Sequence, residues 1–190
     1  MGEAATRRIT ADEFLTWDDG TDQRYELIDG QIVAMAPPSD PHGTIAGNTI
    51  IEIGRRLEGR APCRVIPEAG IRLDEHNHYK ADVAVTCAEP RQAAYVEEPM
   101  LIVEVLSAST HRDDVAVKVK RYIELPSVLE IWLVDSRERW VQVWRRQADA
   151  WIVTMPLRGS DGFESGVLAD GVGLDAVRPE EAHAGLGGGG

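Results

Sequence analysis

The stretch Leu101-Ile-Val-Glu-Val-Leu-Ser107 is the segment that decides the fold. Apart from Glu104 and the terminal serine, its residues are apolar, as is typical of a strand buried on both faces. The sequence therefore predicts a central strand with a carboxylate in its middle. An ionised carboxylate in a dry interior must be neutralised, paired with a cation or bound to a metal. Glu104 alone leaves an ordinary buried ion pair and a metal ligand both open.

Length and composition predict one soluble domain. The chain has 190 residues, of which 43% are hydrophobic and 27% charged, which is ordinary for a globular protein. No apolar run approaches the ~20 residues of a membrane span, and no signal-peptide core follows the first residues. We expect a cytoplasmic protein with no membrane partner. Residues 1–9 should be a flexible N-terminus, 10–178 a single domain and 179–190 a disordered Gly-rich tail.

Two further features of composition bear on partners and redox state. The formal net charge of −12 opposes non-specific attraction to nucleic acid, whose affinity depends on contacts to phosphate. Basic residues do gather around positions 55–64, 118–121 and 145–146. Each group is either a solvated face or, if several converge on one groove, a nucleic-acid footprint. Cys63 and Cys87 form no CxxC pair, and we expect buried free thiols.

Cap and turn signals divide the chain into short elements. Thr10 and Glu13 form a capping-box pattern that predicts a short helix to about Trp17. Asp29-Gly30, between two strand-like runs, predicts a hairpin. The segment around His76 and His78 is expected to be an exposed loop. Periodicity predicts helices over about 41–57 and 110–125, and strands over 64–73, 80–86, 129–135, 140–144 and 150–155, the last three as an antiparallel meander.

Three acids stand in strand-like apolar contexts: Glu26, Asp82 and Glu104. A single one could be a structural salt bridge. Three on one sheet, whose neighbouring strands lie ~4.8 Å apart, suggest convergence on a divalent cation. Oxygen ligands favour Mg²⁺ or Mn²⁺ over zinc.

The helix after the central strand supplies a candidate cation. Its apolar stripe contains Val115, Val119, Tyr122 and Ile123. At ~100° per residue, Lys118 lies closer to the centre of this stripe than Lys120 does, so Lys118 can reach inward. Its alternative is a snorkelling surface lysine. Lys80 is a rival because it shares a strand face with Asp82.

His42 lies in the first turn of the helix expected over 41–57. There it could meet a phosphate at the positive end of the helix dipole, or it could be a surface or capping residue. We place His42, Tyr122 and Lys80 near the site without assigning them a catalytic role.

Six motifs in order resemble those of the Uma-type endonuclease family of the restriction-endonuclease-like, PD-(D/E)xK superfamily. The resemblance covers about Thr10 to Trp151. The motifs are Tyr25-Glu-Leu-Ile-Asp-Gly, Pro38-Ser-Asp-Pro-His-Gly, Ala81-Asp-Val-Ala-Val, Val103-Glu-Val-Leu-Ser, Lys118-Val-Lys-Arg-Tyr and Glu130-Ile-Trp-Leu-Val-Asp.

The resemblance implies roles for individual residues. Asp82 and Glu104 would be the two metal-binding acids of the motif, joined by the carbonyl of Val105. Glu26 would be the upstream acid, which orients the ion or a water. Lys118 would be the lysine that this family carries on a helix. Two positions depart from the superfamily pattern: Ala81 replaces a proline, and Leu106 stands where the motif's lysine would be.

The expected fold is therefore an α/β (α+β) restriction-endonuclease-like core with a mixed, mainly antiparallel sheet flanked by helices. The expected function is hydrolysis of phosphodiester bonds, with DNA as substrate and Mg²⁺ or Mn²⁺ as cofactor. The net charge implies weak or partner-assisted DNA binding, and a homodimer is one candidate assembly. Two alternatives stay open: a catalytically inactive domain of the same fold that binds nucleic acid or protein, and a hydrolase acting on another phosphoester.

Overall fold

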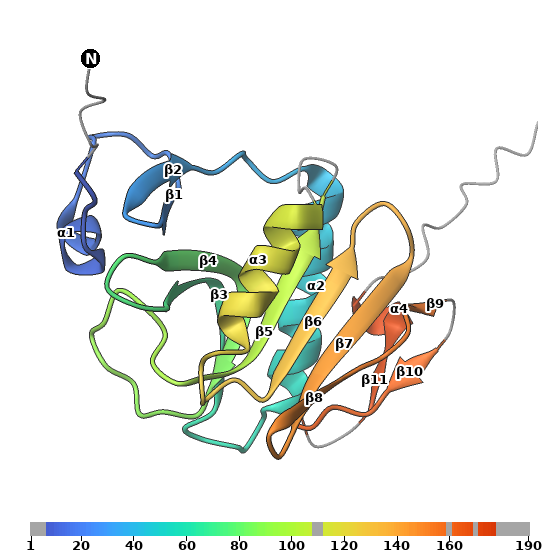
Figure 1. Ribbon diagram of the computed structural model, residues 1–190. Coiled ribbons are helices and arrows are strands. Elements are labelled where there is room, and N and C mark those ends of the chain that lie inside the picture. The colour runs from blue at the N-terminus through green and yellow to red at the C-terminus, as the bar shows by residue number, and fades with distance from the viewer. Residues whose placement is uncertain (1–6, 108–111, 159–160, 169–170, 178–190) are drawn as a thin grey trace, which may run out of the picture.

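A computed structural model describes residues 7–107, 112–158, 161–168 and 171–177. The expectations for residues 1–6 and 179–190, and for the start of the helix at 110, lie outside the described residues. The elements shown in Figure 1 are α1 (Ala11–Thr16), β1 (Tyr25–Ile28), β2 (Gln31–Ala34), α2 (Asp40–Arg56), β3 (Arg64–Arg72), β4 (His78–Thr86), β5 (Pro99–Leu106), α3 (Arg112–Tyr122), β6 (Glu130–Asp135), β7 (Trp140–Gln147), β8 (Ala150–Val153), β9 (Leu157–Arg158), β10 (Gly162–Phe163), β11 (Val172–Gly173) and α4 (Leu174–Val177).

The strands confirm the predicted mixed, mainly antiparallel sheet. Their order is β2-β1-β4-β5-β6-β7-β8, with β3 paired to β4 and β9 paired to β7. β5 and β6 pair in parallel, from Leu101↔Glu130 to Leu106↔Asp135. Parallel neighbours need a crossover connection, and the segment that contains α3 supplies it. The meander β6-β7-β8 is antiparallel, as predicted.

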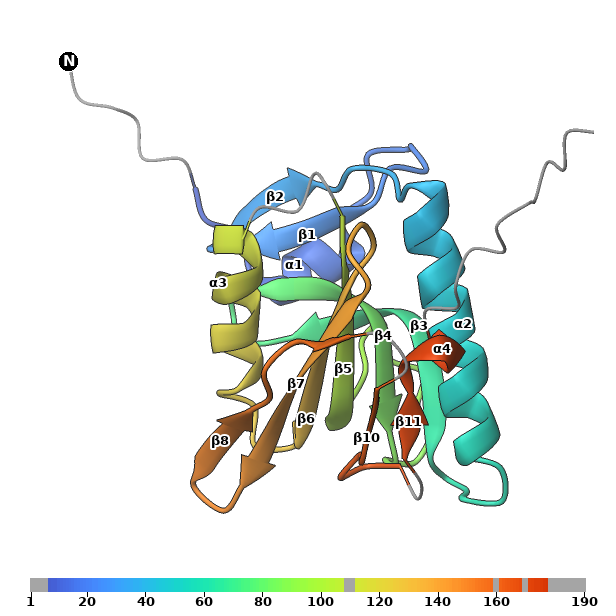
Figure 2. The same cartoon turned by 90° about the vertical axis from the view of Figure 1, so that its right-hand side faces the viewer.

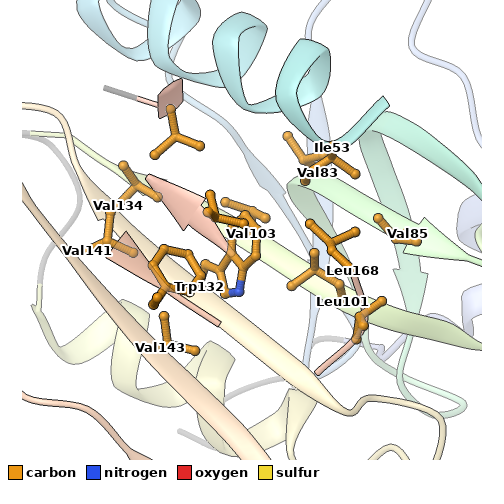
Figure 3. Close-up of a cluster of buried hydrophobic side chains, with 14 of the residues drawn as sticks. Ile53, Val83, Val85, Leu101, Val103, Trp132, Val134, Val141, Val143 and Leu168 are labelled. Atoms are coloured by element: carbon orange, nitrogen blue, oxygen red, sulfur yellow. The ribbon is translucent and has the colours of Figure 1, made fainter. Parts of the chain in front are cut away.

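Two helices cover opposite faces of the sheet, as Figure 2 shows. The apolar residues of the two helices pack in two separate clusters, and the stripe predicted for α3 is confirmed. The α2 face (Figure 3) buries residues that include Ile53, Val83, Leu101, Val103 and Trp132. The α3 face buries Ile102, Val115, Val119, Tyr122 and Ile131, among others. The central strand β5 is therefore buried on both sides.

Strand β4 turns over at Asp82. Tyr79 and Ala81 pack in the α3-side cluster, whereas Val83 packs in the α2-side cluster. Alternate residues of a regular strand point to one face, so this change marks a strong local twist. The pairing of β4 with β5 extends only as far as Val83↔Val103. Beyond that pair the two strands separate, and Asp82 lies at the mouth of the fork.

The predicted hairpin is confirmed. β1 and β2 pair from Tyr25↔Ala34 to Ile28↔Gln31. Asp29 and Gly30 have φ values of 48° and 77°, the left-handed region that a two-residue hairpin turn requires. A Cβ on Gly30 would also come within 2.7 Å of the Arg8 Cβ.

The C-terminal segment packs on the α2 side, an arrangement that no sequence signal predicted. Phe163, Leu168 and Leu174 join the α2-side cluster. The buried carboxylate of Glu130 holds this segment, because it accepts a hydrogen bond from the Gly166 backbone N–H at 2.6 Å.

Two expectations from the sequence are wrong. Cys63 and Cys87 are joined in a disulfide, because the β3–β4 pairing Arg64↔Thr86 brings the two cysteines together. His78 is buried at the start of β4 instead of lying in an exposed loop. In the described ranges, no helix is long and apolar enough to cross a membrane.

Candidate metal and catalytic site

Asp82 and Glu104 come from the two strands that separate at the fork. The Val105 backbone N–H donates to Asp82 Oδ2 at 2.6 Å. This bond spans the gap that the missing β4–β5 ladder leaves, and it fixes the Asp82 carboxylate beside the strand that carries Glu104. The pairing of the two acids predicted from the sequence therefore follows from the geometry of the fork.

Glu104 is a buried acid with two neighbours that stabilise its charged form. Its carboxylate accepts a hydrogen bond from the Tyr122 hydroxyl at 2.7 Å and lies 3.5 Å from the Lys118 ammonium. Desolvation nevertheless dominates and raises the pKa of Glu104 to about 7, against the lowering effect of Lys118. Near neutral pH, this group can hold or release a proton.

Lys118 points inward, as its place on the helical stripe predicted. Its ammonium lies 2.8 Å from Glu26 Oε1 and donates to the Lys80 carbonyl at 3.1 Å. Its side chain is 19% exposed. Burial alone would lower the pKa of Lys118, but the charges of Glu104 and Glu26 outweigh this effect and raise it. The group is therefore a permanent cation at neutral pH.

Lys118 also supplies the cation that is missing from the strand at Leu106, where the motif's lysine would be. Leu106 packs against the α3-side cluster, so its strand position supplies no cation. The helix brings an ammonium to Glu104 instead.

Glu26 reaches the site from β1. Its Oε1 accepts hydrogen bonds from the Lys80 backbone N–H at 2.8 Å and from Lys118. The lysine proposed as a rival, Lys80, thus contributes its backbone, while its ammonium lies 3.9 Å from Glu68. The role of Glu26 as a metal ligand stays a prediction.

His42 contacts the site from the start of α2. Its Nε2 lies 2.9 Å from Asp82 Oδ1. This hydrogen bond raises the pKa of His42 and outweighs the opposing effect of burial. The structure thus brings together the residues predicted for the site, except for the ammonium of Lys80, which lies by Glu68.

The oxygen atoms of the site are of the kind that a hard divalent cation prefers, but they are few. Asp82, Glu104 and the Val105 carbonyl are oxygen donors, and Mg²⁺ is commonly bound by one or two carboxylates with several waters retained. Within residues 7–107, 112–158, 161–168 and 171–177, no three His, Cys, Asp or Glu side chains are grouped to hold a metal. The predicted ligands would therefore be two carboxylates and one carbonyl, with water completing the coordination.

Two contributors to the site could not be seen in the sequence. The backbone N–H groups of Val105 and Lys80 each donate to a site carboxylate. A backbone donor has no residue-type signal, and only the register of the strands reveals it.

Comparison with known proteins identifies the family of this chain. The family model described as "Uma2: Putative restriction endonuclease" matches residues 11–176. The chain belongs to this family. Among curated proteins, "Uncharacterized protein slr1290" of Synechocystis sp. is 28% identical over 163 residues, which is 83% of this chain and 84% of that protein. "Uncharacterized protein sll1609" of the same organism is 28% identical over 166 residues, covering 81% of this chain and 90% of that protein.

A solved structure shares the fold of this Uma2 family member. The crystal structure of "a putative nuclease belonging to DUF820" from Anabaena variabilis superposes with a TM-score of 0.68 at 22% identity. The match covers 83% of this chain and 88% of that one. The predicted restriction-endonuclease-like fold and family are therefore confirmed.

Proposed function

We propose that this Uma2 family member is a Mg²⁺-dependent endonuclease that hydrolyses phosphodiester bonds in DNA, with Mn²⁺ as an alternative ion. The observation that carries the proposal is the inward Lys118, held between Glu26 and Glu104 where the strand itself offers only Leu106. Membership of a family described as restriction endonucleases supports the reaction class.

The acidic side chains of the site would have two different roles, ion binding and the positioning of Lys118. Asp82 and Glu104, with the Val105 carbonyl, would hold the ion. Bound magnesium would lower the pKa of a water molecule and neutralise charge that develops on the phosphate. Hydrogen bonds from Val105 N–H and His42 orient the Asp82 carboxylate. Glu26 holds the ammonium of Lys118 in place.

Lys118 acts as an electrostatic group and not as a general base. Its pKa is raised by Glu104 and Glu26, so it keeps its proton throughout the reaction. An ammonium fixed in this way can donate hydrogen bonds to a phosphate oxygen as negative charge builds up there.

A matched pair of lysine variants tests the proposal. Plasmid DNA is incubated with Mg²⁺ or Mn²⁺ and wild type, Asp82→Asn, Lys118→Met or Lys120→Met. Lys120 lies on the same helix but its side chain is exposed, so Lys120→Met removes a charge without touching the site. We expect Asp82→Asn and Lys118→Met to lose at least ~100-fold in cleavage rate, and Lys120→Met to cut like wild type.

The outcomes separate catalysis from binding. Intact plasmid with wild type in both ions, or equal cutting by Lys118→Met, would sink the endonuclease proposal. Calorimetry with Mn²⁺ supplies a readout independent of cutting, because Asp82→Asn should abolish ion binding. The non-catalytic binding domain is the second candidate, since no group of three or more potential metal ligands occurs in the part of the chain that the structure describes. It would be supported by an intact fold that binds neither ion.

A further inference from the structure

A second charged cluster lies beside the site, on the strand next to Asp82. In the β3–β4 pairing, Pro67↔Val83 and Ala69↔Ala81 flank Glu68, so Glu68 lies across from Asp82. Two cations converge on Glu68: Arg24, which immediately precedes β1, and Lys80 in β4. The Arg24 guanidinium donates to its Oε1 at 2.6 Å, and the Lys80 ammonium is 3.9 Å from its Oε2. The cluster therefore holds one more positive than negative charge.

The acid of this cluster is its most exposed member. The side chain of Glu68 is 54% exposed, against 26% for Arg24 and 29% for Lys80. Glu68 also has a φ of 46°, an uncommon conformation for a residue with a side chain. A carboxylate that is more exposed than the two cations with which it pairs can be replaced by an incoming anion.

Three arginines of the other predicted basic clusters are not available in this way. Arg56 donates to the Gly171 carbonyl at 2.6 Å, and Arg60 to the Val167 carbonyl at 3.1 Å. Arg146 donates to the carbonyls of Ile123 and Leu125. These guanidinium groups hold the chain together, and a ligand could not take them without breaking the fold. Arg24 and Lys80, by contrast, pair with the side-chain carboxylate of Glu68.

An aromatic cavity adjoins the two cations. It has a volume of about 250 Å³ and is lined by two cations, two acids, three aromatic residues and two neutral polar residues: Arg24, Lys80, Asp18, Asp19, Phe14, Trp17, Tyr25, Thr21 and Gln23. Trp17 is 39% exposed and contacts the ring of Tyr25 edge-on, with 4.9 Å between ring centroids. Cations beside an exposed aromatic side chain are the combination that binds a nucleotide, because the cations hold the phosphate and the ring stacks on the base.

We infer that Arg24, Lys80 and Trp17 form a subsite for one nucleotide of the substrate strand, next to the phosphate at the metal site. Its phosphate replaces Glu68 on Arg24 and Lys80, and its base stacks on Trp17. This inference rests on the proposed function. It explains how a chain with a net charge of −12 can hold nucleic acid at the site, through two cations freed by one displaced acid.

The test measures binding, not cutting. Fluorescent single-stranded and duplex oligonucleotides are titrated with Ca²⁺ in place of Mg²⁺, over a series of NaCl concentrations. Arg24→Gln and Lys80→Gln should each weaken binding about tenfold and flatten the slope of log Kd against log salt by about one. Trp17→Ala should weaken binding without changing that slope, because stacking releases no counterions.

Two variants keep the test falsifiable. Glu68→Gln removes the competing acid and should tighten binding, and its exposed side chain leaves the fold intact. Arg158→Gln is the matched control, because Arg158 also pairs with an exposed glutamate, Glu138, at 3.3 Å. It lies in β9 at the opposite end of the sheet, and its loss should leave Kd unchanged.

The possible results separate this subsite from the endonuclease proposal. If Glu68→Gln fails to tighten binding, or if Arg24→Gln behaves like Arg158→Gln, the subsite is refuted even when wild type cuts DNA. If Kd and the salt slope change as predicted but no ion supports cutting, the subsite is supported and the endonuclease proposal is refuted. Wild type that binds neither oligonucleotide at low salt overturns both.

Discussion

Glu104 shows how one residue depends on its neighbours for its chemistry. Burial raises its pKa to about 7, whereas the Tyr122 hydroxyl and the Lys118 ammonium favour its charged form. A divalent ion needs the carboxylate, so protons compete with the ion as the pH falls below about 7. The balance among these groups would set the pH at which the proposed site can bind an ion.

Removing the Tyr122 hydroxyl should shift that balance. In Tyr122→Phe, Glu104 loses a hydrogen bond to its charged form, so its pKa rises further. We expect the midpoint of the pH profile of Mn²⁺ affinity to move upward from about 7, with the affinity at high pH little changed. Calorimetry across a pH series measures this. Tyr79→Phe is the control, because Tyr79 packs near Tyr122 with 6.2 Å between ring centroids. An identical profile in Tyr122→Phe and Tyr79→Phe would contradict the role of this hydroxyl.

Among the elements, α3 matters most to the site because it carries Lys118. Arg146 on β7 fixes the chain just beyond this helix, through 2.9 Å hydrogen bonds to the Ile123 and Leu125 carbonyls and one of 2.8 Å to the Val128 carbonyl. Its guanidinium also lies 4.6 Å from the centroid of the Trp151 ring. A single side chain thus connects α3 to the meander.

Arg146→Ala should therefore loosen α3. We expect a loss of about 1–3 kcal/mol in the free energy of unfolding, because partly buried carbonyls lose their donor. Urea denaturation measures the loss, and hydrogen exchange should show reduced protection in α3. The control is Arg137→Ala, which removes a more exposed arginine that pairs with Asp135 at 3.5 Å. Equal stability of the two variants would refute this anchoring role.

At the scale of the whole molecule, the N-terminal elements α1 and β1 pack against β4, and His78 lies at this contact. Its ring packs 5.3 Å from that of Phe14 in α1, and β1 meets β4 at Leu27↔His78. Neither ring nitrogen has a protein partner in the described part of the chain. Gly70 is required beside it, because a Cβ there would come within 2.9 Å of the imidazole.

Acid should weaken this docking. Desolvation lowers the pKa of His78, and the nearby positive charges of Lys80 and Arg72 act in the same direction, against Glu26. The unfolded chain then binds the proton more readily than the folded one, so stability falls as the pH drops below about 6.5. The limit for one proton is about 1.4 kcal/mol per pH unit.

Comparing two proteins isolates this effect. Urea denaturation at pH 7.5 and pH 5.5 should show a larger loss of stability in wild type than in His78→Leu, which cannot take up the proton. The quantity to compare between the two proteins is the change in the free energy of unfolding from pH 7.5 to pH 5.5, not the free energy at either pH. An equal difference in both proteins would rule His78 out as a source of acid sensitivity.

Sequence patterns predicted the parts of this molecule that depend on local chemistry. Glu104 stood out because an acid interrupts an apolar strand, and Lys118 because helical periodicity turns it inward. The Cys63–Cys87 disulfide and the Glu68 cluster could not be found in this way, since both arise from the register of β3 against β4. The elements β10, β11 and α4 were missed because two to four residues are too few to show a period.

The arginines that hold the fold together also restrict how this protein could search for a target. Proteins slide along a duplex by exchanging many weak contacts between free cations and phosphates. Here Arg56, Arg60 and Arg146 are committed to backbone carbonyls, which removes three cations from such contacts. If DNA is the substrate, each target would be reached by a separate three-dimensional encounter. Binding would then be brief, and the rate at which targets are reached would depend on the local concentration of DNA.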